Sequence, residues 1–351
     1  MRKALILLLP MLLISWSCKK PEESTTNSPA AGPATASKLK IVYIPKNTGN
    51  PYFTDVIKGF EEAAAQGGFD FTTTGPSSAE ATSQIPFIKE QIQRKVDVIA
   101  LTPNSPDALN PVLDEAKAAG IVVITVDADL EKNESHRDAA VLPTDFSKVG
   151  EAQLELMGSQ MNFEGEFAIL SATRDAPNQN AWIAGINEAL KDPKYSKMKL
   201  VATVYGDDEP QKSTTETEAL LTKYPNLKGI LAPTSVGLAA GAQSVQIAGV
   251  FPGGPHAAGP GLMITGLSTP NQMKRFVTDG VVKSFQLWSP HDMGWLACNL
   301  GAAIKSGKVK PAEGASFDDP KLGSHTFGRN SVVNTGPLVT FDKGNIEKYD
   351  F

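Results

Sequence analysis

The chain has 351 residues, more than the roughly 250–300 at which a single hydrophobic core stops growing, so its length predicts two domains. Hydrophobic residues make up 41% and charged residues 20%, as in ordinary globular proteins. A net charge of −5 without a basic stripe argues against a nucleic-acid partner, and two cysteines are too few for a disulfide framework.

The beginning of the chain has the composition of a targeting segment. Two basic residues precede an apolar stretch at 4–14 that is too short to span a membrane. The tetrapeptide SWSC that follows is similar to a bacterial lipoprotein processing site, so we expect a signal peptide over 1–18 and a lipid on Cys18. A plain secretory signal is the alternative. Residues 19–37 are predicted to be a disordered tether, so the folded part is expected in the periplasm or at the cell surface, lipid-anchored to a bacterial membrane.

A strand–loop–helix unit opens the folded part, in the segment KIVYIPKNTGNPYF at 40–53. The apolar run 41–44 predicts a buried parallel strand, Pro45 ends it, and apolar residues at helical spacing begin at Phe53. The unit then recurs. Further strands are expected at 69–73, 98–101, 121–126, 167–170, 200–204, 229–232, 263–266 and 284–288. Helices are expected over 85–96, 109–116, 146–161, 182–190 and 214–221, after Ser235, and around Cys298, which is interpreted as a small buried hydrophobe.

Strands that alternate with helices predict parallel sheets with right-handed crossovers. The series starts again near 141–145, so we expect an α/β fold of two doubly wound parallel-sheet lobes joined by a three-strand hinge, with a cleft between them. The N-terminal lobe is predicted over 38–142 plus 290–335, and the C-terminal lobe over 143–289 plus 336–351. Residues 171–180 are expected to form a polar loop, and the glycine-rich stretch 251–261 a surface loop.

Polar and aromatic residues follow the carboxyl ends of these strands, where open α/β sheets bind ligands. Carboxylates and amides can pair with the hydroxyls of a sugar, while aromatic faces cover its C–H faces. A small-molecule sugar is therefore the expected ligand. The candidate ligand-binding residues are Lys46, Asn47, Asn50, Phe53, Asp127, Asn178, Gln179, Asn180, Trp182, Pro233, Thr234, Ser235, Ser268 and Trp288.

Each candidate also has a structural interpretation. The run at 47–51 is a common turn sequence, and Asp127 could cap a following helix. Isolated tryptophans such as Trp182 and Trp288 are frequently core residues. The amides at 178–180 could lie on the surface. Their joint position at the ends of successive strands favours a binding site.

Little in the sequence supports catalysis. The four histidines lack cysteine or histidine partners at metal-ligand spacing, and the sequence has neither a Gly-x-Ser-x-Gly elbow nor a phosphate-binding glycine loop. The acid pairs at 207–208 and 318–319 are adjacent in sequence, which is typical of solvated loops. We therefore expect no enzyme activity, no cofactor and no metal.

Six stretches of the sequence carry a resemblance to a known family. They are GEFAILSATRDAPNQNAW (165–182), TVYGDDEPQK (203–212), APTSVG (232–237), GLSTPNQM (266–273), KSFQLWSPHDMGW (283–295) and NIEKYDF (345–351). These stretches resemble the periplasmic sugar-binding proteins of ABC importers, in the ribose-binding-like class that shares its fold with the ligand domains of LacI-type repressors. The similarity extends over about 38–351 and is closest to the rhamnose-binding and autoinducer-2-binding branch. The resemblance implies the type I periplasmic binding protein fold.

The resemblance also implies residue roles. Residues 50–53 match the family's first pocket loop, Asp127 matches its strand-four aspartate, and 178–180 match the loop that opens the second lobe's ligand contacts. Residues 233–235 and Trp288 match later contact positions.

Departures from the family pattern bear on the ligand. Ribose and galactose binders carry an arginine where Ala128 stands and an aspartate near Ser268, and this chain lacks both. Autoinducer-2 binders usually have Asp-Gln at 178–179 and Pro-Asp-Ala at 233–235, where rhamnose binders are more similar to this chain. These differences favour rhamnose or a related deoxy sugar, with autoinducer-2 as the alternative.

The implied mechanism is capture of the sugar by hinge closure near 142–143, 288–290 and 335–336, and delivery to the membrane permease of an ABC importer. A chemotaxis or signalling partner in place of the permease is the alternative. A repressor's ligand domain would follow a helix-turn-helix, whereas here a signal segment precedes. The protein is expected to be a monomer.

Overall fold

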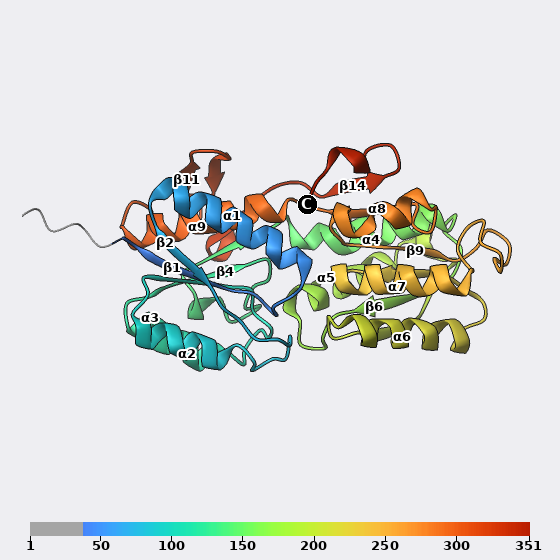
Figure 1. Ribbon diagram of the computed structural model, residues 1–351, viewed down its shortest axis with the longest axis horizontal. Helices are drawn as coiled ribbons and strands as arrows, with labels where there is room; N and C mark the ends of the chain where they lie inside the picture. Colours follow the sequence, from blue (N-terminus) through green and yellow to red (C-terminus); the bar gives the residue numbers. More distant parts are fainter. Residues whose placement is uncertain (1–37) are drawn as a thin grey trace, which may run out of the picture. The chain divides into compact units, whose positions relative to one another are not determined.

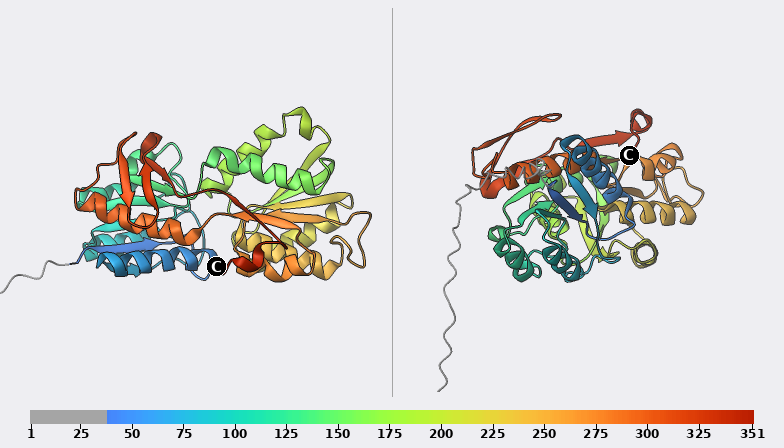
Figure 2. Two further views of the ribbon diagram at one scale, coloured as in Figure 1. Left: turned by 90° about the horizontal axis from the view of Figure 1, so that it is seen from above. Right: turned by 60° about the vertical axis from the view of Figure 1, so that its left-hand side comes forward.

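The computed structural model describes residues 38–351, and Figures 1 and 2 show the arrangement of their helices and strands. The predicted signal peptide, the lipidation of Cys18 and the tether over 19–37 lie outside these residues. No helix within residues 38–351 is long and apolar enough to cross a membrane.

The first sheet is six-stranded and has the order β13-β5-β4-β3-β1-β2. All its neighbouring strands pair in parallel. Its central strands are almost entirely apolar, as in the sequence VIAL of β3, because helices cover both faces of the sheet. The strands are β1 (Lys40–Ile44), β2 (Asp70–Thr73), β3 (Val98–Leu101), β4 (Val122–Val126), β5 (Ala139–Leu142) and β13 (Val332–Asn334).

The second sheet has the parallel order β7-β6-β8-β9. A single parallel bridge between Leu267 and Gln286 adds β10, which pairs antiparallel with β14. A separate hairpin joins β11 (Ser316–Asp319) and β12 (Gly323–Thr326). The remaining strands are β6 (Gly165–Ser171), β7 (Met198–Tyr205), β8 (Leu227–Ala232), β9 (Met263–Gly266), β10 (Ser284–Leu287) and β14 (Val339–Asp342).

Helices cover both faces of each sheet, which confirms the predicted doubly wound α/β class (Figure 1). Around the first sheet, α1 and α9 pack on one face and α2 and α3 on the other. Around the second sheet, α4 and α5 lie on one face and α6 and α7 on the other, with α8 beside α7. The helices are α1 (Pro51–Gly67), α2 (Ile85–Arg94), α3 (Asn110–Ala118), α4 (Phe146–Gln160), α5 (Pro177–Ala189), α6 (Pro210–Lys223), α7 (Ser235–Ala248), α8 (Pro270–Thr278) and α9 (Pro290–Lys305).

The described chain passes between the two groups of elements three times: from β5 to α4, from β10 to α9 and from β13 to β14 (Figure 2). Two of the three passages are hydrogen-bonded to each other. The amide of Thr335 donates to the carbonyl of Leu142 at 2.9 Å, and the amide of Gly336 donates to that of Pro143 at 3.1 Å.

The predicted buried hydrophobe Cys298 lies on α9 with no exposed surface. Burial raises the pKa of its thiol to about 12, so the thiolate is scarce at neutral pH and the side chain acts in packing.

Close contact between α1 and α9 depends on glycine. A Cβ atom at Gly294 would lie 2.0 Å from the carbonyl oxygen of Val56, and one at Gly59 would lie 2.0 Å from that of His291. Because the clashing atoms belong to backbones, the helices cannot yield without separating. The two glycines therefore set the distance between α1 and α9.

We expect Gly294→Ala to lower the free energy of unfolding by about 1–3 kcal/mol through overpacking, in spite of alanine's higher helix propensity. Urea denaturation measures the change. Gly328→Ala is the matched control, because its new Cβ atom meets nothing closer than 3.6 Å. Equal urea midpoints for the two variants would contradict the interpretation of the helix contact.

Candidate functional site

Loops at the carboxyl ends of strands from both sheets surround one pocket. Lys46 and Asn50 follow β1, Asp127 follows β4, Gln179 lies beyond β6, and Trp288 follows β10. Eleven of the fourteen candidate residues line this pocket. They are Lys46, Asn50, Phe53, Asp127, Asn178, Gln179, Trp182, Pro233, Thr234, Ser235 and Trp288.

Three candidates do not line the pocket. Asn47 is buried beside a neighbouring groove. Asn180 is exposed, and its amide donates to the carbonyl of Arg174 at 2.8 Å, because successive residues of a helix point in different directions. Ser268 is fully buried behind the wall, where its hydroxyl donates to the carbonyl of Ser235 at 3.5 Å.

Four further residues line the pocket but were not among the candidates: Tyr52, Asp208, Leu267 and Leu287. The predicted solvated position of Asp208 is wrong, because its carboxylate faces the pocket and accepts a hydrogen bond from the Thr234 hydroxyl. The position of Asp208 directly after β7 could have indicated a place in the pocket, since the carboxyl ends of neighbouring parallel strands meet at one edge of the sheet. The solvated interpretation of Asp319 is also wrong: it is buried and accepts from the Trp295 indole at 2.9 Å.

The predicted polar loop over 171–180 is shorter than expected, because α5 already begins at Pro177. Proline is favoured in the first turn of a helix, where its missing amide hydrogen costs nothing. This start places Asn178 and Gln179 in the first helical turn rather than on a loop. Helical geometry thus fixes the direction of both amide side chains toward the pocket.

Asn178 connects the two sheets through its amide group. Its Oδ1 accepts from the ammonium group of Lys46 at 2.7 Å, and its Nδ2 donates to Oδ2 of Asp127 at 3.2 Å. The Gln179 amide donates to the carbonyl of Pro233 at 2.5 Å. A third link between the sheets runs from the Ser235 hydroxyl to Oδ1 of Asn50, at 3.3 Å.

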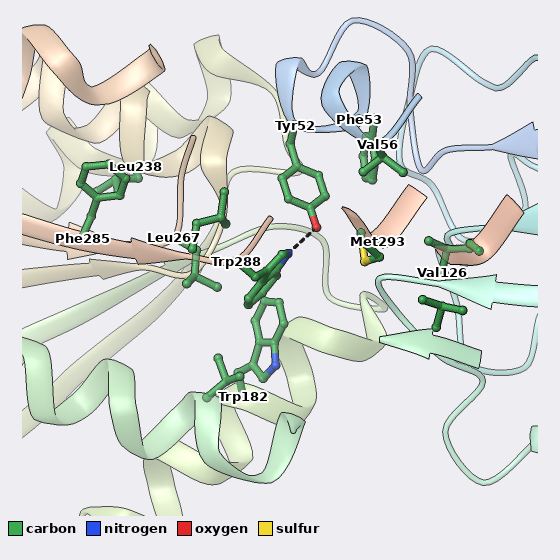
Figure 3. Packing of buried hydrophobic residues seen from close by; sticks show 14 of the residues in the cluster. Tyr52, Phe53, Val56, Val126, Trp182, Leu238, Leu267, Phe285, Trp288 and Met293 are labelled. Atoms are coloured by element: carbon green, nitrogen blue, oxygen red, sulfur yellow. Dashed lines mark hydrogen bonds between the residues drawn. The ribbon is translucent and has the colours of Figure 1, made fainter. Parts of the chain in front are cut away.

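Three aromatic residues that line the pocket, Tyr52, Trp182 and Trp288, lie close together (Figure 3). The Trp288 indole donates to the Tyr52 hydroxyl at 2.7 Å, which in turn donates to Oδ1 of Asp127 at 2.5 Å. The Trp182 ring lies beside that of Trp288, with centroids 5.7 Å apart and an interplanar angle of 57°. Both tryptophans are buried, so they serve the core and the pocket at the same time.

The sequence left a purely structural role open for Asn50, in a turn, and for Asp127, as a helix cap. Asn50 does cap a helix, because its Oδ1 accepts from the amide of Tyr52 at the start of α1, yet it lines the pocket as well. Asp127 does not cap a helix. Its carboxylate accepts from Tyr52 and Asn178 within the pocket.

Burial controls the charges of the site. It raises the pKa of Asp127 to about 6, against the opposing effects of Lys46 and of the Tyr52 hydrogen bond. Burial likewise raises the pKa of Asp208, although Lys46 and the Thr234 hydroxyl oppose the shift. It also lowers the pKa of Lys46, while Asp127 and Asp208 act in the opposite direction. The pocket therefore holds one ammonium group together with two carboxyl groups, of which Lys46 and Asp127 are buried and Asp208 is half-buried.

The sequence pattern of the family described as "Periplasmic binding protein domain" matches residues 41–308. A solved structure of a sugar ABC transporter from Actinomyces odontolyticus is 37% identical, with a TM-score of 0.70, over 89% of this chain and 98% of that chain. An ABC transporter solute binding protein from Clostridium phytofermentas, solved with bound L-rhamnose, is 32% identical, with a TM-score of 0.83 and the same coverage.

Curated relatives match over a shorter length. A D-ribose/D-allose-binding protein from Pseudomonas aeruginosa is 25% identical over 205 residues, which are 56% of this chain and 63% of that protein. The chain spans about three fifths of the length of the curated relatives it matches. The family match covers most of the chain, and the structural matches cover nearly all of the folded part. The chain therefore belongs to the periplasmic binding protein domain family.

Proposed function

We propose that this protein captures a sugar, rhamnose or a related 6-deoxy sugar, and delivers it to an ABC importer. The single observation that carries this proposal is the composition of the pocket. Two carboxyl groups and an ammonium group lie together with amides, hydroxyls and two indole rings, all from strand ends of both sheets. Hydrogen bonds to charged groups contribute about 1.5–3 kcal/mol each, so a few of them are enough for micromolar affinity.

Part of the pocket wall is apolar, which suits a sugar with a methyl group. Leu267, Leu287 and Phe53 supply this part, beside the indole of Trp288. A 6-deoxy sugar replaces one hydroxyl by hydrogen, and an apolar wall leaves no buried polar group without a partner there. The relative solved with L-rhamnose supports the same choice, as does the alanine at position 128 in place of the arginine of ribose binders.

Binding is proposed to proceed by closure of two lobes over the sugar. We assign 38–142 plus 290–335 to one lobe and 143–289 plus 336–351 to the other, since the sheets and the three passages of the chain support this division. The centre of a water-sized sphere can occupy only about 40 Å³ of the pocket, room for about three water molecules. A sugar is larger, so its admission requires the lobes to open.

X-ray scattering with and without a saturating sugar tests the closure. Ligand contacts from both lobes favour the closed state, so the radius of gyration is expected to fall on binding. Unchanged dimensions at saturation would contradict lobe closure while leaving sugar binding intact.

The proposed setting is the outside of a bacterial membrane. The predicted signal peptide and the predicted lipid on Cys18 support this location, and a membrane permease is the proposed partner of a monomeric binding protein. We assign a binding role rather than an enzymatic one, because the chain belongs to the periplasmic binding protein domain family. A chemotaxis or signalling protein that binds the closed form of this protein is the alternative partner.

A thermal-shift panel of L-rhamnose, fucose, ribose and autoinducer-2 tests the ligand. The sugar that binds is expected to raise the melting temperature, since a ligand at about 100 times its Kd adds about 2.7 kcal/mol of stability. The largest shift with L-rhamnose or fucose supports the proposal. The largest shift with autoinducer-2 would establish the alternative ligand, and no shift with any of the four would refute sugar capture.

A further inference from the structure

The backbone of Asp127 has an unusual conformation. Its φ is +67°, and the amide of the next residue, Ala128, donates to the carbonyl of Val126 at 2.7 Å. A hydrogen bond across one residue with positive φ defines the rare and strained form of γ-turn. Non-glycine residues hold such a conformation only where their surroundings impose it. The turn aims the Asp127 carboxylate at Tyr52 and Asn178.

An ion pair directly behind this turn holds it in place. Asp129 accepts two hydrogen bonds from the guanidinium group of Arg137, at 2.6 and 2.5 Å. The same carboxylate accepts from the Thr125 hydroxyl of β4 at 2.7 Å and from the amide of Leu130 at 2.8 Å. The loop is thereby tied back to the strand from which it emerges.

The guanidinium group of Arg137 is fixed on its other side too. It donates to the carbonyl of Asn330 at 2.7 Å, just before β13, and the side chain is only 1% exposed. A planar guanidinium group that forms two hydrogen bonds with one carboxylate holds both groups in one orientation, which the ammonium group of a lysine cannot do. The ion pair does not line the pocket, so its effect on a ligand has to pass through Asp127.

We propose that Asp129 and Arg137 are positioning residues, which hold the γ-turn at Asp127 so that its carboxylate meets the sugar. This inference rests on the proposed function for its affinity readout. The hydrogen-exchange readout below does not, because it follows the turn itself without any ligand.

The first test is hydrogen exchange of the free protein. Asp129→Asn is expected to increase exchange of the amides at 127–130, because the turn loses the pairing that holds it. Lys117→Met is the matched control. Its ammonium group donates to the carbonyls of Ser135 and Arg137 at 2.9 and 3.1 Å, later in the same loop. This control is expected to change exchange near 135–138 but not at the turn. Unchanged exchange at 127–130 in Asp129→Asn overturns the proposal.

The second test is a double-mutant cycle, in which calorimetric titration with L-rhamnose measures the Kd of each variant. Asp129→Asn alone is expected to raise Kd by about 10- to 100-fold, as for loss of a hydrogen bond to a charged group. In an Asp127→Asn background it is expected to add little, since its effect passes through that side chain. Equal losses in both backgrounds would show a general structural role and overturn the proposal.

A third variant covers the case in which Asp129→Asn leaves Arg137 buried without a partner and does not fold. The neutral pair Asp129→Asn/Arg137→Gln removes both charges and goes through the same measurements. Absence of L-rhamnose binding by the unmodified protein refutes that ligand, and the exchange data then decide the positioning role alone.

Discussion

Replacing Asp127 by asparagine is expected to raise the dissociation constant for the captured sugar by about 10- to 100-fold. The carboxylate is buried at the centre of the pocket and accepts hydrogen bonds, and a neutral amide accepts fewer and weaker ones. Asparagine tolerates positive φ better than most residues, so the +67° turn survives the change. Calorimetric titration of the sugar measures the loss.

Asp318→Asn provides the matched control for this substitution. It makes the same change of charge at an exposed position on β11, which does not line the pocket. The control is expected to bind the sugar as the unmodified protein does. An Asp127→Asn variant with equal affinity would remove Asp127 from the proposed site.

The second large effect is the dependence of affinity on pH. The pKa of Asp127 is raised to about 6 by burial, so at about pH 5 most of the carboxyl is protonated and affinity is expected to be about tenfold lower than at neutral pH. The ionised form is the one that accepts from the hydroxyls of a sugar. In Asp127→Asn this pH dependence is expected to be reduced to the part that Asp208 contributes. An equally steep dependence in the variant would assign it to another group.

The same pKa predicts that the stability of the ligand-free protein falls as the pH rises, whereas the affinity for the sugar increases. A carboxyl whose folded pKa lies near 6 rather than 3.8 contributes stability that is fully present below about pH 3.8 and lost as the pH rises through 6. Relative to the unmodified protein, the ligand-free Asp127→Asn variant should therefore gain about 2 kcal/mol between about pH 4.5 and 7.5. Urea denaturation at both pH values measures this difference.

The two expected pH effects act in opposite directions. Above pH 6 the ionised Asp127 is expected to bind a sugar best and to destabilise the ligand-free protein most. Lys46 and Tyr52 reduce this cost by favouring the charged form, whereas Asp208 increases it. The buried carboxylate thus lowers the stability of the ligand-free protein at the place where the ligand is expected to bind.

Much of this protein follows from its sequence alone. Apolar runs such as 98–101 fill strands buried on both faces, so their position depends on local composition and not on distant partners. Because parallel strands end at one edge of a sheet, the residues directly after those strands could be assigned to a common pocket. Asp127, Trp288 and nine other candidates do lie there.

Only the tertiary structure decided the rest. Whether Asn180 faces the pocket depends on the residue at which α5 begins. A start one or two residues earlier or later would turn its side chain to a different side of the helix. The pair Asp207-Asp208 predicted a solvated loop. However, Thr234 donates a hydrogen bond to Asp208 and Lys46 affects its pKa, and both residues follow other strands. The strands β13 and β14 pair with segments far away in the chain, and their few residues carry no pattern of their own. Contacts between distant residues set these features, so no stretch of sequence read by itself contains them.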